Sequence, residues 1–116
     1  MTGAWGERQA CGYLRARGWE IVQCNFRTRF GEIDIIARHG KYIIFAEVKT
    51  RRSSRFAAAR ESVTAAKQAR IIAAAEEWLQ TYAGTAQPRF DVIEVYGSED
   101  APLPPHINLI ENAFGG

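Results

Sequence analysis

The sequence predicts an α/β protein with one central mixed sheet and helices on the faces of that sheet. Three observations support this class. Two short apolar runs, IDIIA and YIIFAEV, flank a two-residue turn at His39 and Gly40. An alanine-rich stretch with helical periodicity comes next, and a further apolar run, FDVIEVY, follows it. A chain of 116 residues suits one core, so we expect a single domain over residues 1–116 with the order α-β-β-β-α-β.

The first predicted helix covers residues 3–17 and ends near Gly18, because glycine suits the left-handed position that follows many helices. Residues 20–26 (EIVQCNF) alternate in polarity, which predicts a strand. Residues 32–37 and 42–48 predict the two strands of the hairpin. Both runs are apolar on both faces, which is typical of central strands covered on both sides.

The second half of the chain begins with a basic loop or helix start over residues 51–60. Residues 61–83 predict a helix that ends at Gly84. The apolar stripe of this helix consists of Val63, Ala66, Ile71, Ala74, Ala75, Trp78 and Tyr82. Residues 89–96 predict another strand, and residues 106–110 predict a short edge strand.

Charged side chains interrupt the two hairpin strands. Asp34 lies in the first run, and Glu47 and Lys49 lie in the second. With the predicted turn, Asp34 faces Phe45, and Glu47 is its diagonal neighbour on the same face, with Cα atoms about 7–8 Å apart. Glu32 then lies directly opposite Glu47. Two acids at that distance can share a divalent cation, and three nearby acids repel one another unless a cation or basic group is present.

Carboxylate ligands without histidine favour Mg²⁺ or Mn²⁺ over zinc. Such a cation can polarise a phosphodiester and lower the pKa of a bound water. Lys49 shares a strand face with Glu47 and is placed to orient that water or to stabilise charge on the phosphate. A Glu-x-Lys tripeptide also occurs at many ordinary strand ends. Its weight here comes from Asp34 on the neighbouring strand, from Glu7 upstream and from the basic segment downstream.

Glu7 is the acid of the first predicted helix. It shares one helix face with Ala10, Cys11 and Leu14, which are otherwise apolar or small. An acid on a core-facing stripe is costly unless it is paired or coordinates something. The favourable dipole interaction in the first turns of a helix explains the same position without any site. The sequence leaves both interpretations open.

Basic residues are concentrated in one segment. Residues 49–70 carry seven Lys or Arg against one acid, a net charge of +6, whereas residues 71–116 carry one Arg against seven acids, a net charge of −6. The basic segment suits a polyanion such as nucleic acid, and it equally suits a solvated loop and helix face.

Arginines on both sides of the charged hairpin are candidates for phosphate contacts. Arg51, Arg52 and Arg55 follow the hairpin and are the better candidates, because phosphate contacts commonly come from such groups. Arg27 and Arg29 precede the acidic strand. They can contact phosphates or balance the neighbouring acids, and we favour the phosphate contact.

The two cysteines, Cys11 and Cys24, form no close Cys-x-x-Cys pair. We expect both to be reduced, small core residues of a cytoplasmic protein. No apolar stretch has the length of a membrane span, and the first residues lack the apolar region of a secretory signal. We therefore expect no membrane partner.

These residues resemble the PD-(D/E)XK, or restriction-endonuclease-like, nucleases. The chain is most similar to the YraN-like family of small bacterial proteins, which is distantly similar to archaeal Holliday-junction resolvases. The resemblance covers residues 3–114. It rests on the segments GAWGE, NFRTRFGEIDIIA, FAEVKTRRSSRF and RFDVIEV, together with Lys67.

The resemblance implies a restriction-endonuclease-like αβββαβ core and a set of catalytic positions. Asp34 matches the metal-binding aspartate of that superfamily. Glu47 and Lys49 match its Glu-x-Lys pair, and the backbone carbonyl of Val48 would be a further metal ligand. Glu7 matches the first-helix glutamate of the resolvase-like branch.

Two further positions bear on the resemblance. Lys67 lies where related nucleases often have a polar residue on the following helix, and we add it to the candidates for nucleic-acid contact. Ala57 stands where the family pattern has a glycine, which affects the basic loop and not the metal site.

The resemblance implies an endonuclease dependent on Mg²⁺ or Mn²⁺ that acts on DNA rather than RNA. Branched or junction DNA suits the resolvase-like branch, and a homodimer would suit a two-fold junction. One alternative is a non-catalytic nucleic-acid-binding module that retains a nuclease fold. Another is a protein-interaction domain in which the charges form a structural ion-pair cluster.

Overall fold

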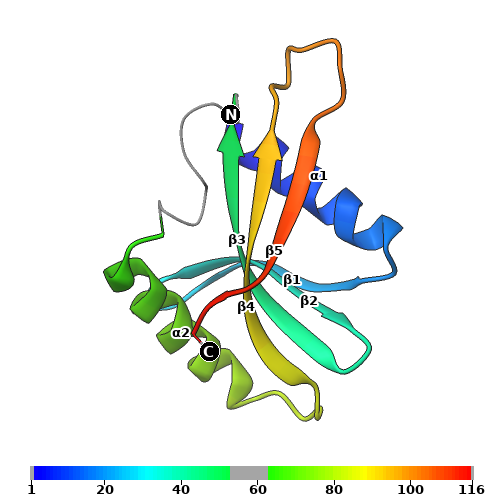
Figure 1. Cartoon of the computed structure of the whole chain (residues 1–116). Helices are drawn as coiled ribbons and strands as arrows, with labels where there is room; N and C mark the ends of the chain where they lie inside the picture. The colour runs from blue at the N-terminus through cyan, green and yellow to red at the C-terminus, as the bar shows by residue number, and fades with distance from the viewer. Residues whose placement is uncertain (1, 53–62, 116) are drawn as a thin grey trace.

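The structure is a computed structural model that describes residues 2–52 and 63–115 (Figure 1). In chain order the elements are α1 (Thr2–Ala16), β1 (Glu20–Arg27), β2 (Glu32–His39), β3 (Tyr42–Arg51), α2 (Ala65–Leu79), β4 (Gln87–Tyr96) and β5 (His106–Phe114). The strands form one sheet in the order β1-β2-β3-β4-β5. Strands β3 and β4 are parallel, and the other neighbouring pairs are antiparallel. The predicted α/β class and the predicted order of elements are confirmed.

The two helices lie on opposite faces of the sheet (Figure 1) and build two separate apolar cores. Ile43 and Phe45 of β3 pack on the α2 side together with Ile71. Ile44 of the same strand packs on the α1 side together with Leu14. Successive side chains of a strand point to opposite faces, so a strand between two cores must be apolar on both. This arrangement explains the two continuous apolar runs of the hairpin.

The helix ends follow local capping chemistry. Gly18 has a φ of 89°, and the Trp19 amide donates to the carbonyl of Leu14 at 3.0 Å, as in a Schellman motif. Helix α2 begins after Thr64, whose hydroxyl accepts a hydrogen bond from the Lys67 amide at 3.2 Å. Among the described residues, neither helix is both long and apolar enough to cross a membrane.

Helix α2 is shorter than predicted. Its last helical residue is Leu79, five positions before Gly84. The amides of Thr81 and Tyr82 donate to the carbonyls of Trp78 and Leu79, three residues back, so the chain tightens into turns before it reaches the glycine.

The hairpin turn lies one residue later than predicted. Gly40 and Lys41 occupy the two turn positions, and His39 pairs with Tyr42. Gly40 has a φ of 57°, which glycine readily adopts at the first position of a type II′ turn. Gly40 therefore occupies the first of the two turn positions and not the second, which the sequence predicted.

This later turn changes the strand register. Ile36 pairs with Phe45, so the predicted pairing of Asp34 with Phe45 is wrong, as is that of Glu32 with Glu47. The register differs by two residues, which is one full side-chain repeat of a strand. Asp34 and Glu47 therefore keep the shared face that the sequence predicted.

The prediction that both cysteines lie in the core is half wrong. Cys11 is buried, but Cys24 is exposed. Strand β1 lies at the edge of the described sheet, next to β2, so its side chains have less cover than those of the central strands.

Helix α1 crosses the end of β3 closely at Gly6. A Cβ atom on Gly6 would overlap Oγ1 of Thr50 and would lie 3.3 Å from Cβ of the same threonine. Gly6, the second glycine of the GAWGE segment, therefore permits the contact between helix and sheet.

We predict that Gly6→Ala destabilises the protein by about 1–2 kcal/mol, because overpacking outweighs the gain in helix propensity. Gly12 is a matched control in the same helix, since a Cβ there would meet no atom within 4 Å. Gly12→Ala should stabilise the protein by up to about 1 kcal/mol. Urea denaturation of the two variants tests the contact. An equal gain in stability for both would show that α1 does not press on Thr50.

Candidate functional site

Asp34 and Glu47 meet at the point where the β2–β3 ladder ends. They lie just beyond the last pair of this ladder, Ile35 with Ala46. The Val48 amide donates a hydrogen bond of 2.8 Å to Oδ2 of Asp34, which ties this carboxylate to the neighbouring strand. A hollow of about 140 Å³ lies here and is lined by Gly31, Glu32, Asp34, Glu47, Lys67, Arg70 and Ile71.

The loop before β2 brings α2 against this hollow. The Thr28 amide donates to the carbonyl of Gly31 at 2.9 Å, and the Gly31 amide donates back to the Thr28 hydroxyl at 3.2 Å. A Cβ on Gly31 would lie 3.0 Å from Cβ of Arg70 and 3.3 Å from its carbonyl oxygen. The glycine of the GEIDIIA segment thus allows the helix to close one wall of the site.

Glu47 is a buried carboxylate with two ammonium partners. Its side chain is only 7% exposed, and Oε2 lies 2.8 Å from Nζ of Lys67 and 3.4 Å from Nζ of Lys49. A buried charge is tolerated only when it is paired. Lys67 comes from the first turn of α2, so this ion pair joins the helix to β3. Lys67, which the sequence predicts as a contact for nucleic acid, lines the hollow around Asp34.

Asp34 is in the opposite electrostatic situation. Burial, followed by the negative charges of Glu47, Glu7 and Glu32, raises the pKa of Asp34 to about 7. The hydrogen bond from Val48 acts the other way but is outweighed. The site therefore contains one carboxylate neutralised by lysines and one whose charged form is disfavoured by burial and by nearby acids.

The two lysines differ in their proton affinity. Burial and the neighbouring Lys67 lower the pKa of Lys49 more than Glu47 raises it. Burial also acts to lower the pKa of Lys67, but its hydrogen bonds with Glu47 and Lys49 and the charges of Glu47 and Asp34 together outweigh burial and raise that pKa overall. Of the two lysines, Lys67 therefore holds its proton more tightly. Lys49, 15% exposed, is the amine more able to exchange a proton with a water molecule.

Glu7 lies on the other side of the sheet. It lines a separate hollow of about 500 Å³ with Ala4, Arg8, Cys11, Arg15, Cys24 and Asn25. Its charge still contributes to the raised pKa of Asp34. Glu7 is therefore an electrostatic neighbour of the hollow around Asp34 and does not line it.

The predicted phosphate-contacting arginines are spread over several surfaces. Nε of Arg27 donates to Oε2 of Glu32 at 2.8 Å, so this side chain balances an acid, which is the alternative that the sequence allowed. The Arg29 guanidinium lies 5.0 Å from the centre of the Phe30 ring. Neither arginine lines the hollow around Asp34.

The remaining arginines lie at and beyond the end of β3. Nη1 of Arg51 approaches the carbonyl of Thr50 at 3.4 Å. Arg52 is exposed and lines a small hollow with Trp5. Arg55 and the departure at position 57 lie outside the described residues.

Sequence reasoning missed a polar row beside Lys49. Glu94 pairs with Lys49 across β3 and β4, and Asn108 pairs with Glu94 across β4 and β5. Glu94 is 4% exposed and accepts hydrogen bonds from Tyr96 Oη at 2.6 Å and from Asn108 Nδ2 at 2.8 Å. An acid within the apolar run DVIEVY was a signal of the same kind as Asp34. Its relation to Lys49 depends on the β4 register, which the sequence does not reveal.

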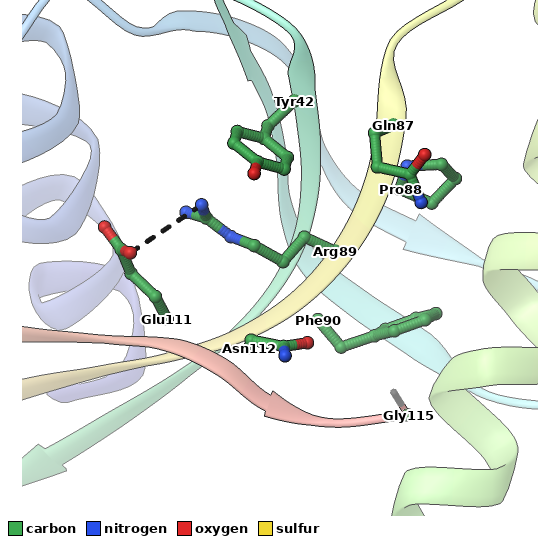
Figure 2. Close-up of a pocket in the computed structure, with 8 residues that line it drawn as sticks. All are labelled: Tyr42, Gln87, Pro88, Arg89, Phe90, Glu111, Asn112 and Gly115. Atoms are coloured by element: carbon green, nitrogen blue, oxygen red, sulfur yellow. Dashed lines mark ion pairs between the residues drawn. The ribbon is translucent and has the colours of Figure 1, made fainter.

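A larger hollow of about 610 Å³ lies at the starts of β3 and β4 (Figure 2). Arg89 extends into it toward Glu111, with Tyr42 nearby. Its guanidinium binds the fully buried Asp91 through two nitrogens, at 2.9 and 2.8 Å, and lies 3.8 Å from Glu111. The charge of Arg89 is thus satisfied within the protein, which makes this hollow a poor candidate for anion binding or catalysis.

We predict that Arg89→Met destabilises the protein by about 3–5 kcal/mol, because the variant leaves a buried carboxylate without its partner. Arg38 is the matched control, since its pair with Glu20 is 2.9 Å long but exposed. Arg38→Met should cost no more than about 1 kcal/mol. Chemical denaturation measures both losses, and similar small values for both would contradict a structural role for the buried pair.

The raised pKa of Asp34 predicts how stability depends on pH. The folded protein binds the Asp34 proton more tightly than the unfolded chain, whose pKa is close to 3.8. The contribution of the Asp34 proton to the free energy of unfolding is therefore fully present below about pH 4 and is lost as the pH rises through about 7.

Asp34→Asn has no carboxylate, so it avoids this loss of stability at high pH. Its amide oxygen can still accept the hydrogen bond from the Val48 amide. In chelator at pH 8, we expect the variant to be more stable than the parent by no more than about 4 kcal/mol, at about 1.36 kcal/mol per pKa unit. The advantage should shrink at pH 5. Denaturation curves of both proteins across this range measure it, and a constant difference would contradict the electrostatic cause.

The chain has clear relatives among known proteins. Residues 6–95 match the family described as "Uncharacterised protein family UPF0102". A UPF0102 protein of Caldicellulosiruptor saccharolyticus is 44% identical over 110 residues, 94% of this chain and 92% of that protein. One of Symbiobacterium thermophilum is 44% identical over 114 residues, which cover 97% and 95% of the two chains.

A UPF0102 protein of Syntrophotalea carbinolica is 50% identical over 94 residues, which cover 80% of this chain and 76% of that protein. The matched region contains the four positions Glu7, Asp34, Glu47 and Lys49. The predicted YraN-like family and UPF0102 are the same family, so the predicted family is confirmed. The chain belongs to the protein family UPF0102.

Proposed function

We propose that this protein is a metal-dependent endonuclease that hydrolyses phosphodiester bonds in DNA. The observation that carries the proposal is that Asp34 and Glu47, at the end of one strand ladder, line the same hollow as Lys67. Lys49 lies beside Glu47 at 3.4 Å. Asp34 is an acid of raised pKa, Glu47 is an acid neutralised by lysines, and Lys49 is an amine of lowered pKa. These three neighbouring groups can serve different chemical functions.

The donor set fits magnesium or manganese. No group of three or more His, Cys, Asp or Glu side chains in residues 2–52 and 63–115 is arranged to hold a metal ion, as a closed zinc site would require. Mg²⁺ needs only one or two carboxylates and keeps several waters. Asp34 and Glu47 would supply those carboxylates, with the Val48 carbonyl as a further oxygen. A bound cation would offset the burial and the repulsion that raise the pKa of Asp34, and it would polarise a phosphate and acidify a water.

The protein's own side chains would then position the reacting groups. Lys49 orients the attacking water and stabilises charge on the phosphate, because it lies next to Glu47 with a lowered pKa. Lys67 fixes the Glu47 carboxylate through its 2.8 Å ion pair. Arg70 at the rim of the hollow offers a phosphate contact. Glu7 acts through its field and would assist from a distance.

DNA in the cytoplasm is the proposed substrate, with branched or junction DNA as the preferred form and a homodimer as the matching assembly. Arg51 and Arg52 would extend the phosphate contacts from the end of β3. Arg29 would add a contact from the loop before β2. Because no base-reading motif is evident in the sequence, DNA shape would provide the selectivity.

One observation favours a second candidate function. Glu47 is already neutralised by Lys49 and Lys67 without any metal ion. The same hollow could therefore be the stable ion-pair cluster of a nucleic-acid-binding module that does not cut. Metal binding distinguishes the two functions, since the module needs no cation.

The decisive experiment is a cleavage assay on linear duplex, single-stranded, flap and four-way-junction DNA, with RNA as a comparison, in Mg²⁺ or Mn²⁺. We expect cutting of DNA by the wild-type protein and loss of about 100-fold or more in Asp34→Asn and Lys49→Ala. Chelator should abolish cutting. Glu76→Gln, at an exposed position on α2, is the control and should cut at the normal rate.

Titration calorimetry with Mn²⁺ completes the test. The nuclease proposal expects a metal site in the wild-type protein that Asp34→Asn loses. A folded protein that binds DNA but neither binds metal nor cuts any of these substrates would overturn it in favour of the binding module.

A further inference from the structure

Two thiols that are distant in the sequence meet between α1 and β1. The Sγ atoms of Cys11 and Cys24 lie 3.9 Å apart, and both cysteines are free. The sulfurs of a disulfide lie about 2.05 Å apart, so closure requires a movement of about 2 Å. Rotation of two side chains can supply a movement of that size.

Access to the two thiols is unequal. Cys24 is exposed on the edge strand β1, whereas Cys11 is buried on α1. One hollow of about 500 Å³ is lined by both cysteines, and its volume admits a small reagent. Burial, with added repulsion from Cys24, raises the pKa of Cys11 to about 11, so Cys11 is a slow first nucleophile. A reagent in the hollow would therefore react first at Cys24.

We propose that Cys11 and Cys24 form a reversible dithiol–disulfide pair that is oxidised by low-molecular-weight disulfides. Intracellular disulfides of this kind are usually transient and sense redox conditions. The proposal is independent of the nuclease function, because it rests on the two sulfurs and the hollow over them.

The chemistry balances in two exchange steps. The Cys24 thiolate attacks one sulfur of the small disulfide, a Cys24–sulfur bond forms, and the first small thiolate leaves with the electron pair of the broken bond. The Cys11 thiolate then attacks Sγ of Cys24, and the second small thiolate leaves. The protein loses two hydrogens in total, and the small disulfide is reduced to two thiols.

The bond would change how β1 is held. Among the strands that the structure describes, β1 pairs only with β2. A bridge from Cys24 to Cys11 would attach the middle of this edge strand to α1 as well. The bridged segment includes the turn at Gly18, where hydrogen bonds already fix the helix end. Glu7 lies one helical turn before Cys11 and lines the same hollow, so oxidation would also restrict its surroundings.

The test equilibrates the full chain with mixtures of reduced and oxidised glutathione, quenches with acid, alkylates free thiols and measures intact mass. In oxidised glutathione we expect a monomer that has lost two hydrogens and accepts no alkyl group. Reduced glutathione should restore both thiols. Cys11→Ser should accumulate one glutathione on Cys24, because the resolving thiol is missing. Cys24→Ser should react at least ten times more slowly than Cys11→Ser, because Cys11 is buried.

Hydrogen exchange gives a second measurement that does not depend on alkylation. Amides of residues 20–27 should exchange more slowly in the oxidised wild-type protein than in the reduced protein, and the Cys24→Ser protein should show no such change. Three outcomes would overturn the proposal: a lasting glutathione adduct on wild-type Cys24, a disulfide-linked dimer, or two thiols that stay free in excess oxidised glutathione. Circular dichroism of the reduced variants checks that each is folded.

Discussion

The ion pair between Glu47 and Lys67 is the constraint on which the rest of the site depends. A carboxylate at the centre of a sheet that is only 7% exposed requires a partner, and the partner at 2.8 Å comes from another element. This requirement fixes where the first turn of α2 must lie over β3. The N-cap residue Thr64 lies three residues before Lys67, so Lys67 falls in the first turn of the helix. Gly31 then permits the loop before β2 to approach Arg70.

That ion pair also explains why Asp34 carries the electrostatic strain. Lys49 and Lys67 both direct their ammonium groups to Oε2 of Glu47, so the second acid of the hollow keeps its repulsion. Among the described residues, the only hydrogen bond to Asp34 comes from the Val48 amide. The hollow therefore holds one carboxylate that two ammonium groups neutralise and one whose charged form is disfavoured by burial and by nearby acids.

The sequence was sufficient for most of the fold because its signals are local. Periodicity and turn residues predicted the elements, and Gly18 predicted the end of α1. The hairpin register failed by two residues because a glycine can stand first or second in a two-residue turn, and only the paired strands decide between them. The predicted sheet face of Asp34 was nevertheless correct, since a register shift of two residues returns every side chain to the same side. Cys24 was misplaced because an edge strand and a covered strand can have similar sequences.

The candidate site was predictable only in part, for a related reason. Asp34, Glu47 and Lys49 lie on adjacent strands of one hairpin, so strand geometry alone brings them together. The closeness of Lys67 to Glu47 depends on how a helix lies across a sheet, and the position of Glu94 beside Lys49 depends on a parallel pairing with a strand more than 40 residues later. Tertiary packing sets both relations, and no short-range pattern encodes them.

The row from Lys49 through Glu94 to Asn108 shows what the sheet contributes to the site. Three strands hold these side chains in register, and Glu94 is fixed by hydrogen bonds of 2.6 and 2.8 Å. Groups on paired strands are positioned more precisely than groups on loops. The side chains proposed for chemistry therefore lie on rigid elements around β3. Arg29 lies on the loop before β2, and Arg52 lies just past the end of β3. This division is suited to a site in which the reacting groups need exact geometry while phosphate contacts need only charge within reach, because electrostatic attraction depends weakly on direction.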